Sequence, residues 1–336
     1  MMSIIGGVAT APARALAYTD GRRAVRLAFL AGAASNEILQ HLPATSAELT
    51  VRCEAQRPDR LEAWLRVGLE LGELDCPDGT WTVAGRRSRA IVTNDAFVAP
   101  FYRSVAEYYV GSHVELTELI GPSPGRKDLS VSATTIADVS RVTEHLLAGT
   151  ISAAVDEVQP ATWLEVGCGS GVHLATAMVR QPALTAVAVD LDAAVVDDAS
   201  ARLQALGIAD RAELRVGDAL DVVEPSERFD IVTLLNNIYY FPADTRAALM
   251  ERLSTMVKPG GELIVASQCA AGPGERGSIA AAQLDYLLRV QSEANASLPT
   301  IADLQALVRN ASSISTIDVH RPVPGEPYVV VRGRVA

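Results

Sequence analysis

The chain of 336 residues has little lysine, little basic charge and no long apolar runs. Lysine occurs only at Lys127 and Lys258, and 40 acidic residues against 29 basic ones give a formal net charge of −11. This charge argues against non-specific attraction to nucleic acid or to anionic membranes. No apolar run reaches the roughly 18 residues that span a bilayer. With 49% hydrophobic residues, the composition is that of a globular protein large enough for two domains.

Cysteine and histidine are too few and too scattered to build a recognisable metal centre. The four cysteines form no C-x-x-C pair, and the five histidines lack an H-E-x-x-H motif or a clustered carboxylate. We therefore expect free thiols in a reducing cytoplasm and no metal. Residues 1–17 lack a basic segment, and Gly6, Gly7 and Pro12 break their apolar stretch, so no signal peptide is expected.

The most informative segment is WLEVGCGSG, which runs from Trp163 to Gly171. Its apolar residues predict a buried parallel strand, and the residues from Val172 onward continue with helical spacing. Between strand and helix, Gly167, Gly169 and Gly171 permit a sharp turn and the close approach of a ligand that a Cβ would exclude. The segment therefore predicts a ligand-binding loop between a strand and a helix.

The spacing of these glycines distinguishes two kinds of nucleotide site. A dinucleotide fingerprint, G-x-G-x-x-G, needs glycine or alanine where this chain has Val172. The pattern G-x-G-x-G, preceded by Glu165 at the carboxyl edge of the sheet, instead resembles the first motif of the class I S-adenosylmethionine-dependent methyltransferases. A tight turn without a ligand is the alternative for the loop taken alone.

Four later segments fall at further strand ends, in the order that this resemblance implies. They are AVAVD ending at Asp190, Gly217-Asp218-Ala219, FDIVTLLN ending at Asn236, and the turn Lys258-Pro259-Gly260-Gly261. A carboxylate at Asp190 can accept both ribose hydroxyls because it has two acceptor oxygens. Taken singly, Asp190 could be a solvated strand end and Asp218 a helix cap. The resemblance implies S-adenosylmethionine as cofactor and a binding set of Glu165, Gly167, Cys168, Gly169, Gly171, Asp190, Leu191, Gly217, Asp218, Ala219 and Asn236.

The pattern after Pro160 predicts an α/β fold. Strands near 162–166, 185–190, 212–216, 229–235 and 262–267 alternate with helices such as 193–206 and 244–256, which gives a parallel sheet covered on both faces. The strands 314–319 and 328–331 are joined by a loop too short for a helical crossover, so the last strand is expected to be antiparallel. We predict a Rossmann-like class I methyltransferase sheet, parallel with one antiparallel terminal strand, preceded by a mainly helical winged-helix-like domain.

The expected domain organisation has four parts. Residues 1–20 are a loosely ordered arm, 21–95 a winged-helix-like dimerisation domain, 96–155 a helical linker and substrate lid, and 156–336 the S-adenosylmethionine-binding domain. The helix from 134 to 158 is expected to be interrupted near Gly149.

Short helices followed by a hairpin suggest the winged helix. Capping boxes are expected at Thr45 with Glu48 and at Asp59 with Glu62. The second helix, ending at Leu74, presents an apolar face, and Asp78-Gly79 supplies the turn of the hairpin. The members of that face are Leu61, Trp64, Leu65, Gly68 and Leu71. Similar modules serve for dimerisation and as substrate lids in the plant-type O-methyltransferases and related bacterial tailoring enzymes, which the chain resembles.

The catalytic residues are expected beyond the fourth parallel strand. Metal-independent O-methyltransferases carry a histidine base there, and this chain has Tyr239 at that position, followed by Tyr240. A phenol with a pKa near ~10 is a poor base at neutral pH, so the acceptor atom is expected to be carbon or nitrogen somewhat more than oxygen. Alternatively, His113 or His145 from the helical linker replaces the missing base.

An aromatic pocket is predicted for a small, flat or hydrophobic acceptor. Its expected members are Tyr102, Tyr108, Tyr109, Asn237, Tyr239 and Tyr240, and Tyr239, Tyr240 and His113 are the expected catalytic residues. Plain core packing is the alternative for the tyrosines. The predicted protein is a homodimeric, cytoplasmic small-molecule methyltransferase of secondary metabolism.

The sequence disfavours two other functions. A winged-helix regulator that senses the ligand without turnover is disfavoured because the second helix is mixed to acidic and would not neutralise DNA phosphates. A nicotinamide-dependent oxidoreductase is disfavoured by Val172 and by the antiparallel end of the sheet.

Overall fold

The computed structural model describes residues 10–93, 98–122, 125–127, 133–275, 277–291, 296–322 and 324–336. The chain divides into two units, Met1–Val114 with Thr134–Val139 and Glu115–Ala133 with Ser140–Ala336. Within the described residues, no helix is both long and apolar enough to cross a membrane.

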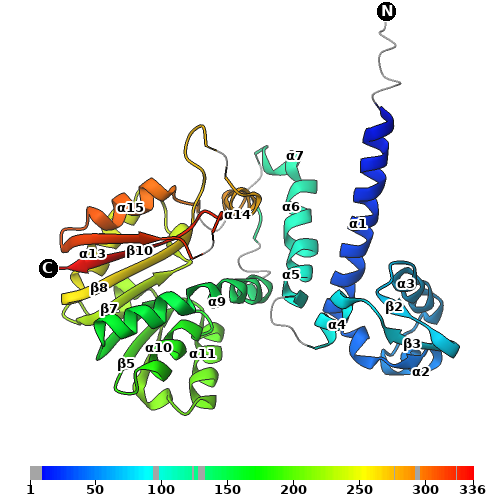
Figure 1. The fold of residues 1–336 in the computed structure, drawn as a ribbon, viewed down its shortest axis with the longest axis horizontal. Helices are drawn as coiled ribbons and strands as arrows, with labels where there is room; N and C mark the ends of the chain where they lie inside the picture. Colours follow the sequence, from blue (N-terminus) through cyan, green and yellow to red (C-terminus); the bar gives the residue numbers. More distant parts are fainter. Residues whose placement is uncertain are drawn as a thin grey trace, which may run out of the picture. The chain divides into compact units, whose positions relative to one another are not determined.

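The first unit is built from helices around a small sheet (Figure 1). The sheet has the order β1-β3-β2, with both pairs antiparallel, so the predicted hairpin is present. Its core includes Phe29, Leu65 and Trp81. The elements are α1 (Thr10–Asn36), η1 (Ile38–His41), β1 (Ala44–Thr45), α2 (Ser46–Arg52), α3 (Pro58–Glu70), β2 (Leu74–Asp75), η2 (Pro77–Gly79), β3 (Thr80–Val83), α4 (Arg86–Val92), α5 (Val98–Ser104), the π-helical turn η3 (Val105–Tyr109) and α6 (Val110–Val114).

Several local expectations for this unit are confirmed and others are wrong. Thr45 and Glu48 form the predicted capping box, and the expected apolar face of α3 packs into the core. Asp59 and Glu62 form no box, because α3 begins with Pro58 after Arg57 and has no side-chain cap. The helix ends at Glu70 rather than Leu74. Residues 10–20, expected to be a loosely ordered arm, are the first turns of α1.

The second unit is a seven-stranded sheet with helices on both faces (Figure 1). The strand order is β6-β5-β4-β7-β8-β10-β9. The pairs from β6 to β8 are parallel, and β10 is antiparallel to both β8 and β9, as predicted. The elements are α7 (Leu116–Leu119), α9 (Ala133–Val158), β4 (Thr162–Val166), α10 (Val172–Arg180), β5 (Thr185–Asp190), α11 (Ala193–Ala205), η4 (Ala209–Arg211), β6 (Ala212–Val216), α12 (Ala219–Val222), β7 (Phe229–Leu235), η5 (Ile238–Tyr240), α13 (Arg246–Thr255), β8 (Val257–Gln268), α14 (Ile279–Arg289), α15 (Ile301–Arg309), β9 (Ile314–His320) and β10 (Tyr328–Val335).

The alternation of side chains along β4 explains how the sheet is covered. Leu164 and Val166 join one core cluster with residues of α13, α14 and α15, whereas Trp163 joins another with residues of α9, α10 and α11. Since successive side chains of a strand point to opposite faces, an apolar run such as this one must be covered on both. The glycine loop follows the carboxyl end of β4 directly.

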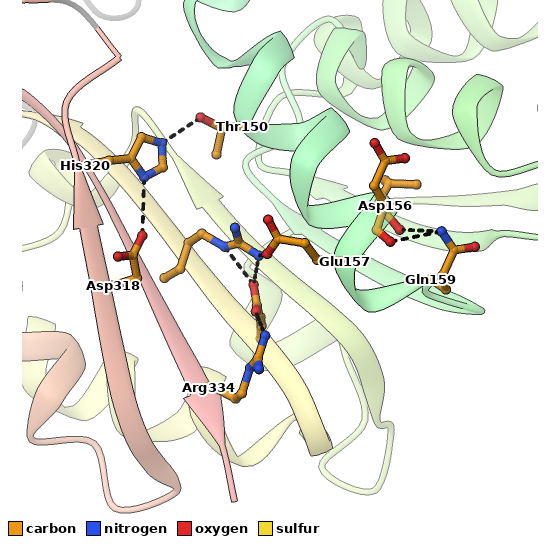
Figure 2. Close-up of polar contacts among 10 residues, drawn as sticks. Thr150, Asp156, Glu157, Gln159, Asp318, His320 and Arg334 are labelled. Atoms are coloured by element: carbon orange, nitrogen blue, oxygen red, sulfur yellow. Dashed lines mark hydrogen bonds and ion pairs between the residues drawn. The ribbon is translucent and has the colours of Figure 1, made fainter.

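The helix α9 is anchored to the antiparallel end of the sheet by polar contacts (Figure 2). Oγ1 of Thr150 lies 3.0 Å from Nε2 of His320 on β9. Arg332 on β10 donates to Glu157 at 2.7 Å and to the buried Glu262 of β8 at 2.8 Å, and Arg334 donates to Glu262 at 2.7 Å. The predicted interruption near Gly149 is wrong, because the helix continues through it on the packing of Leu147 and Ile151.

Candidate cofactor site and reaction centre

The three loop glycines adopt the left-handed conformation that other residues disfavour. Their φ angles are +69° at Gly167, +52° at Gly169 and +71° at Gly171. A Cβ at Gly167 would overlap Nδ2 of Asn237, and one at Gly171 would lie 3.0 Å from Cβ of Ala199. Around Gly169, by contrast, a Cβ would meet no protein atom within 4 Å. Gly167 and Gly171 therefore permit packing, and Gly169 leaves open space beside the backbone.

The glycine loop is fixed from three directions. The amides of Gly167 and Cys168 donate to the carbonyl of Val189 on β5, at 2.8 and 3.0 Å. The amide of Gly169 donates to Oδ2 of Asp190 at 3.0 Å, and Nε of Arg202 on α11 donates to the carbonyl of Ser170 at 2.8 Å. Cys168 is buried, and burial raises the pKa of its thiol, so it acts here as packing rather than as a nucleophile.

The acid Asp190 ends β5 beside this loop, where a ribose ligand was predicted. Its Oδ1 accepts from the amide of Asp192 at 3.2 Å, in addition to the Gly169 contact of Oδ2. Each carboxylate oxygen accepts more than one hydrogen bond, so both keep capacity for a ligand hydroxyl. The next residue, Leu191, is a large apolar side chain left 75% exposed. Together they offer hydroxyl acceptors beside an apolar surface, which suits a nucleoside.

The exit of β6 lies next to that of β5. The amide of Gly217, at φ +140°, donates to the carbonyl of Asp190 at 2.9 Å. Asp218 caps α12, because its Oδ1 accepts from the amide of Leu220 at 2.9 Å, and the following Ala219 is buried. The helix-cap alternative therefore describes Asp218 correctly, and contact of its exposed carboxylate with a ligand stays a prediction.

Two further polar residues lie close to the glycine loop, Glu165 on β4 and Asn237 after β7. Glu165 is buried, and its Oε1 lies 3.4 Å from Nδ1 of His173 in the first turn of α10. Asn237 donates from Nδ2 to the carbonyl of Val166 at 2.6 Å, which fixes its amide so that Oδ1 is a buried acceptor with no donor in the described part of the chain. A ligand with an N–H or O–H group would satisfy this oxygen.

Asn236 adopts a strained conformation at the exit of β7. Its φ is +58°, and its Oδ1 accepts a hydrogen bond of 2.6 Å from the hydroxyl of Tyr328 on β10. The expected contact between Asn236 and a cofactor stays a prediction, since this oxygen faces the sheet. Strain of this kind occurs where the surrounding structure imposes it, often at functional sites.

The tyrosine pair follows in η5. The ring centroids of Tyr239 and Tyr240 lie 4.8 Å apart at 59°, and Tyr239 belongs to the core cluster of this face. Burial raises the pKa of Tyr240 to about 12, so its phenol keeps its proton throughout the neutral range. The phenol of Tyr240 is therefore not a proton acceptor at neutral pH, and the catalytic role of Tyr239 stays a prediction.

The remaining predicted residues belong to the first unit. His113 on α6 is exposed, Tyr108 is buried, and Tyr109 is half-buried. Tyr102 packs against the core of that unit, and desolvation raises the pKa of both Tyr102 and Tyr109. Their contact with an acceptor stays a prediction, and the side chain of His145, the other candidate base, lies outside the described residues.

The chain is similar to known methyltransferases in sequence and in structure. Residues 164–261 match the family described as methyltransferase domain. A curated relative, the release factor glutamine methyltransferase of Cereibacter sphaeroides, is 36% identical over 119 residues, which are 34% of this chain and 41% of the relative. The chain thus spans less than half the length of the curated relatives it matches.

Solved structures resemble nearly the whole chain. An O-methyltransferase family protein from Burkholderia thailandensis has a TM-score of 0.78 at 18% identity, over 97% of this chain and 98% of the other. Mitomycin 7-O-methyltransferase has a TM-score of 0.76 at 21% identity, over 98% and 100%. The fold is therefore that of the class I S-adenosylmethionine-dependent methyltransferases, as predicted. More particularly, residues 164–261 match a methyltransferase domain, within a fold that an O-methyltransferase family protein shares over nearly the whole chain.

The site fits S-adenosylmethionine. The space above Gly169 admits a ligand against the backbone, and Asp190 with Leu191 provides hydroxyl acceptors beside an apolar surface. Among the residues that the structure describes, none donates to the buried Oδ1 of Asn237, and a bound molecule could supply that donor. Within the described residues, no group of three or more histidine, cysteine or acidic side chains converges as a metal site would.

Sequence reasoning missed the residues that support this site. Arg202 holds the loop carbonyl, His173 faces Glu165, and Tyr328 binds Asn236. Each partner lies far along the chain or is a common residue type without a motif. Only the helical position of His173, directly after the loop, could have drawn attention to it.

Proposed function

We propose that this chain is an S-adenosylmethionine-dependent methyltransferase that acts on a small aromatic or hydrophobic molecule, in the tailoring of secondary metabolites. The observation that carries the proposal is the hydrogen bond from the Gly169 amide to Asp190, which joins the open glycine loop to the acid of the neighbouring strand. Ligands of open α/β sheets bind at such carboxyl edges.

The residues around the loop divide the work of binding and positioning. Asp190 would hold the ribose hydroxyls, and Leu191 would cover one face of the base. The cofactor supplies an electrophilic methyl group when bound. The protein then has to align a nucleophile with this methyl group and exclude water from the site. Tyr239, which is buried, and Tyr240, which is half-buried, would help to exclude water at the exit of β7.

We favour carbon or nitrogen slightly over oxygen as the acceptor atom. An amine, an enolate or an electron-rich aromatic carbon needs little help from a base, and the raised pKa of Tyr240 removes that phenol as a candidate base. The similar proteins act on different acceptors, a glutamine in one and the 7-oxygen of mitomycin in another. Likeness of fold therefore does not choose the atom.

An O-methyltransferase with a base from the helical linker is the second candidate. His113 is exposed on α6 and could meet an acceptor hydroxyl, and His145 was the other candidate from the sequence. Replacement of His113 by glutamine tests this candidate, because loss of a general base should lower the rate of methyl transfer by about 10²–10⁴-fold.

The assay that tests the proposed function uses S-adenosylmethionine labelled on its methyl group. We would incubate the full chain with separate panels of phenols, arylamines and enolisable carbonyl compounds, beside a glutamine peptide and duplex DNA. Label in a small-molecule panel is the expected result, and the panel identifies the acceptor atom. Transfer only to the peptide, or to none of the panels, would contradict the proposal.

A ligand-sensing DNA regulator is a weaker alternative. The helix α3 would face DNA in a winged helix, yet Arg66 on it pairs with Glu62 at 3.1 Å, and Arg57 just before it pairs with Asp59 at 2.7 Å. Paired guanidinium groups release few counterions from DNA. A mobility-shift assay at low salt should show no complex, and a salt-sensitive complex without methyl transfer would favour the regulator.

We also propose that the protein is a homodimer in which a second copy covers α1. All residues from 13 to 25 of this helix are exposed, including Leu16 at 65%, Tyr18 at 73% and Val25 at 50%. Helices gain most of their stability from tertiary packing, so several solvent-exposed turns indicate that another surface packs against this part of α1. Sedimentation equilibrium should give twice the chain mass, and replacing Leu16 and Tyr18 by glutamate should give the monomer.

A further inference from the structure

Arg246, the first residue of α13, is a buried cation that has no ion pair among the described residues. Only 4% of its surface is exposed, and desolvation lowers the pKa of its guanidinium. A buried charge without a carboxylate partner is costly unless hydrogen bonds compensate for the lost water. The compensation here comes from backbone carbonyls, and their positions indicate what the residue does.

The guanidinium of Arg246 joins two segments that are far apart in sequence. Nε donates to the carbonyl of Phe241 at 2.9 Å, and Nη2 donates to the carbonyl of Ser297 at 2.6 Å. Longer contacts of 3.4 Å run from Nη2 to the carbonyl of Tyr239 and to Oγ of Ser297. The segment that follows β7 is thereby held against the segment that precedes α15.

The joined segments are also bonded to one another and to the rest of the fold. The amide of Ser297 donates to the carbonyl of Tyr239 at 3.2 Å. The amide of Leu298 donates to Asp285 of α14 at 2.8 Å, and the amide of Ala270, after β8, donates to the carbonyl of Pro299 at 2.9 Å. Residues 297–299 are thus hydrogen-bonded to three other segments of the fold, and Arg246 adds further hydrogen bonds between them and the tyrosine segment.

We infer that Arg246 is a positioning residue for methyl transfer, which sets where Tyr239 and Tyr240 lie by binding the backbone carbonyls of Tyr239 and Phe241. This inference rests on the proposed function. An arginine suits the task because its planar fork presents several donors in fixed directions, whereas a lysine ammonium reaches one segment at a time. Small misplacements at a reaction centre can lower rates by about 10²-fold.

The cofactor-binding residues do not take part in this arrangement. The glycine loop and Asp190 bond to one another and to residues of β5, α11 and the exit of β6, whereas Arg246 bonds to the carbonyls of Tyr239, Phe241 and Ser297. Loss of Arg246 should therefore separate two quantities. Cofactor affinity should persist, while the turnover number with the methyl acceptor should fall.

The test compares Arg246→Met and Arg246→Lys with Arg252→Met, a matched control on the same helix. Hydrogen exchange of the Ser297 amide, which reports the contact with Tyr239, should quicken about 10-fold or more in both Arg246 variants and stay unchanged in the control. The dissociation constant for S-adenosylhomocysteine should stay within about 3-fold. The turnover number should fall by about 10²-fold in Arg246→Met, with the cofactor KM retained.

Two results would overturn the inference. One is unchanged exchange at the Ser297 amide in the Arg246→Lys variant. This variant keeps the positive charge, so it provides the test even if Arg246→Met does not fold. The other is a cofactor affinity that falls in step with activity, which would indicate general loss of structure. If the wild-type chain binds no cofactor, the proposed function fails, whereas the exchange experiment still reports on the contacts of Arg246.

Discussion

The backbone amide of Gly169 donates a hydrogen bond of 3.0 Å to Oδ2 of Asp190, and so ties the open part of the glycine loop to the end of the next strand. The contact joins two residues that sequence analysis assigned to one cofactor. It also means that Asp190 has two tasks, because its carboxylate orders the loop before any ligand arrives. Variants at these two positions should separate binding from folding.

The first prediction concerns Asp190. Its replacement by alanine should weaken S-adenosylhomocysteine binding by about 10–100-fold, because hydrogen bonds to a charged group contribute ~1.5–3 kcal/mol. Calorimetric titration measures the change, and circular dichroism checks that the protein stays folded. Asp210→Ala, at another exposed acid of the same unit, is the control. Equal affinity in the two variants would mean that the ribose contact is misassigned.

The second prediction contrasts two glycines with the same backbone strain. Gly169 and Gly260 have φ angles of +52° and +79°, and a Cβ at either would meet no protein atom within 4 Å. Alanine at each should cost about 1–2 kcal/mol of folding free energy from the left-handed conformation alone. Only Gly169→Ala should also abolish cofactor binding, because its Cβ would fill the space that the ligand needs.

Urea unfolding and calorimetry of these two alanine variants provide the measurement. A Gly260→Ala variant that loses the cofactor as completely as Gly169→Ala would indicate a global effect. A Gly169→Ala variant that binds normally would remove the loop from the site.

The third prediction concerns the phenols at the exit of β7. Because burial raises the pKa of Tyr240 to about 12, the rate of methyl transfer should show no step from this group between pH 6 and 10. Tyr239→Phe should lower the rate by less than the ~10²–10⁴-fold expected for a general base. Tyr286→Phe, which removes a half-buried phenol of α14, is the control. A loss within that range would make Tyr239 a participant in proton transfer.

The same burial gives a fourth prediction, on stability at high pH. The phenol of Tyr240 stays protonated in the folded chain up to about pH 12, whereas in the unfolded chain it ionises near its ordinary pKa of 10.0. Between these values the folded state binds more protons, so the stabilisation present below pH 10 is lost as the pH rises. Urea midpoints from pH 9 to 11 should fall less steeply in Tyr240→Phe than in the wild type.

Prediction from sequence succeeded where a local pattern has one physical meaning. The strand 162–166 was placed correctly because an apolar run that ends in glycines can be a covered strand and little else. The antiparallel pairing of β10 followed from the short connection before Tyr328. These signals depend on backbone geometry, which nearby residues determine.

The failures arose where packing outweighs local preference. Gly149 reads as a helix interruption that costs ~1 kcal/mol, and the buried residues Leu147 and Ile151 on either side of it offset that cost. The acids Asp59 and Glu62 have the spacing of a capping box. Because Pro58 begins the helix, however, Asp59 lies inside the first turn and not at the N-cap position.

The contacts that support the site could not be predicted from sequence at all. Tyr328 reaches Asn236 across 92 positions, and Arg246 reaches Ser297 across 51. No spacing rule links such pairs, because the sheet topology alone brings them together. The cofactor loop is local and could be recognised, whereas the reaction centre is assembled from distant segments.

The most direct test of the account is a calorimetric titration of the full chain with S-adenosylmethionine, S-adenosylhomocysteine and NAD in parallel. We predict one site per chain for the two sulfur compounds, lost in Gly169→Ala, and no binding of NAD at the same concentrations. Heat from NAD alone, or from none of the three, would contradict the assignment of the glycine loop and Asp190 to this cofactor.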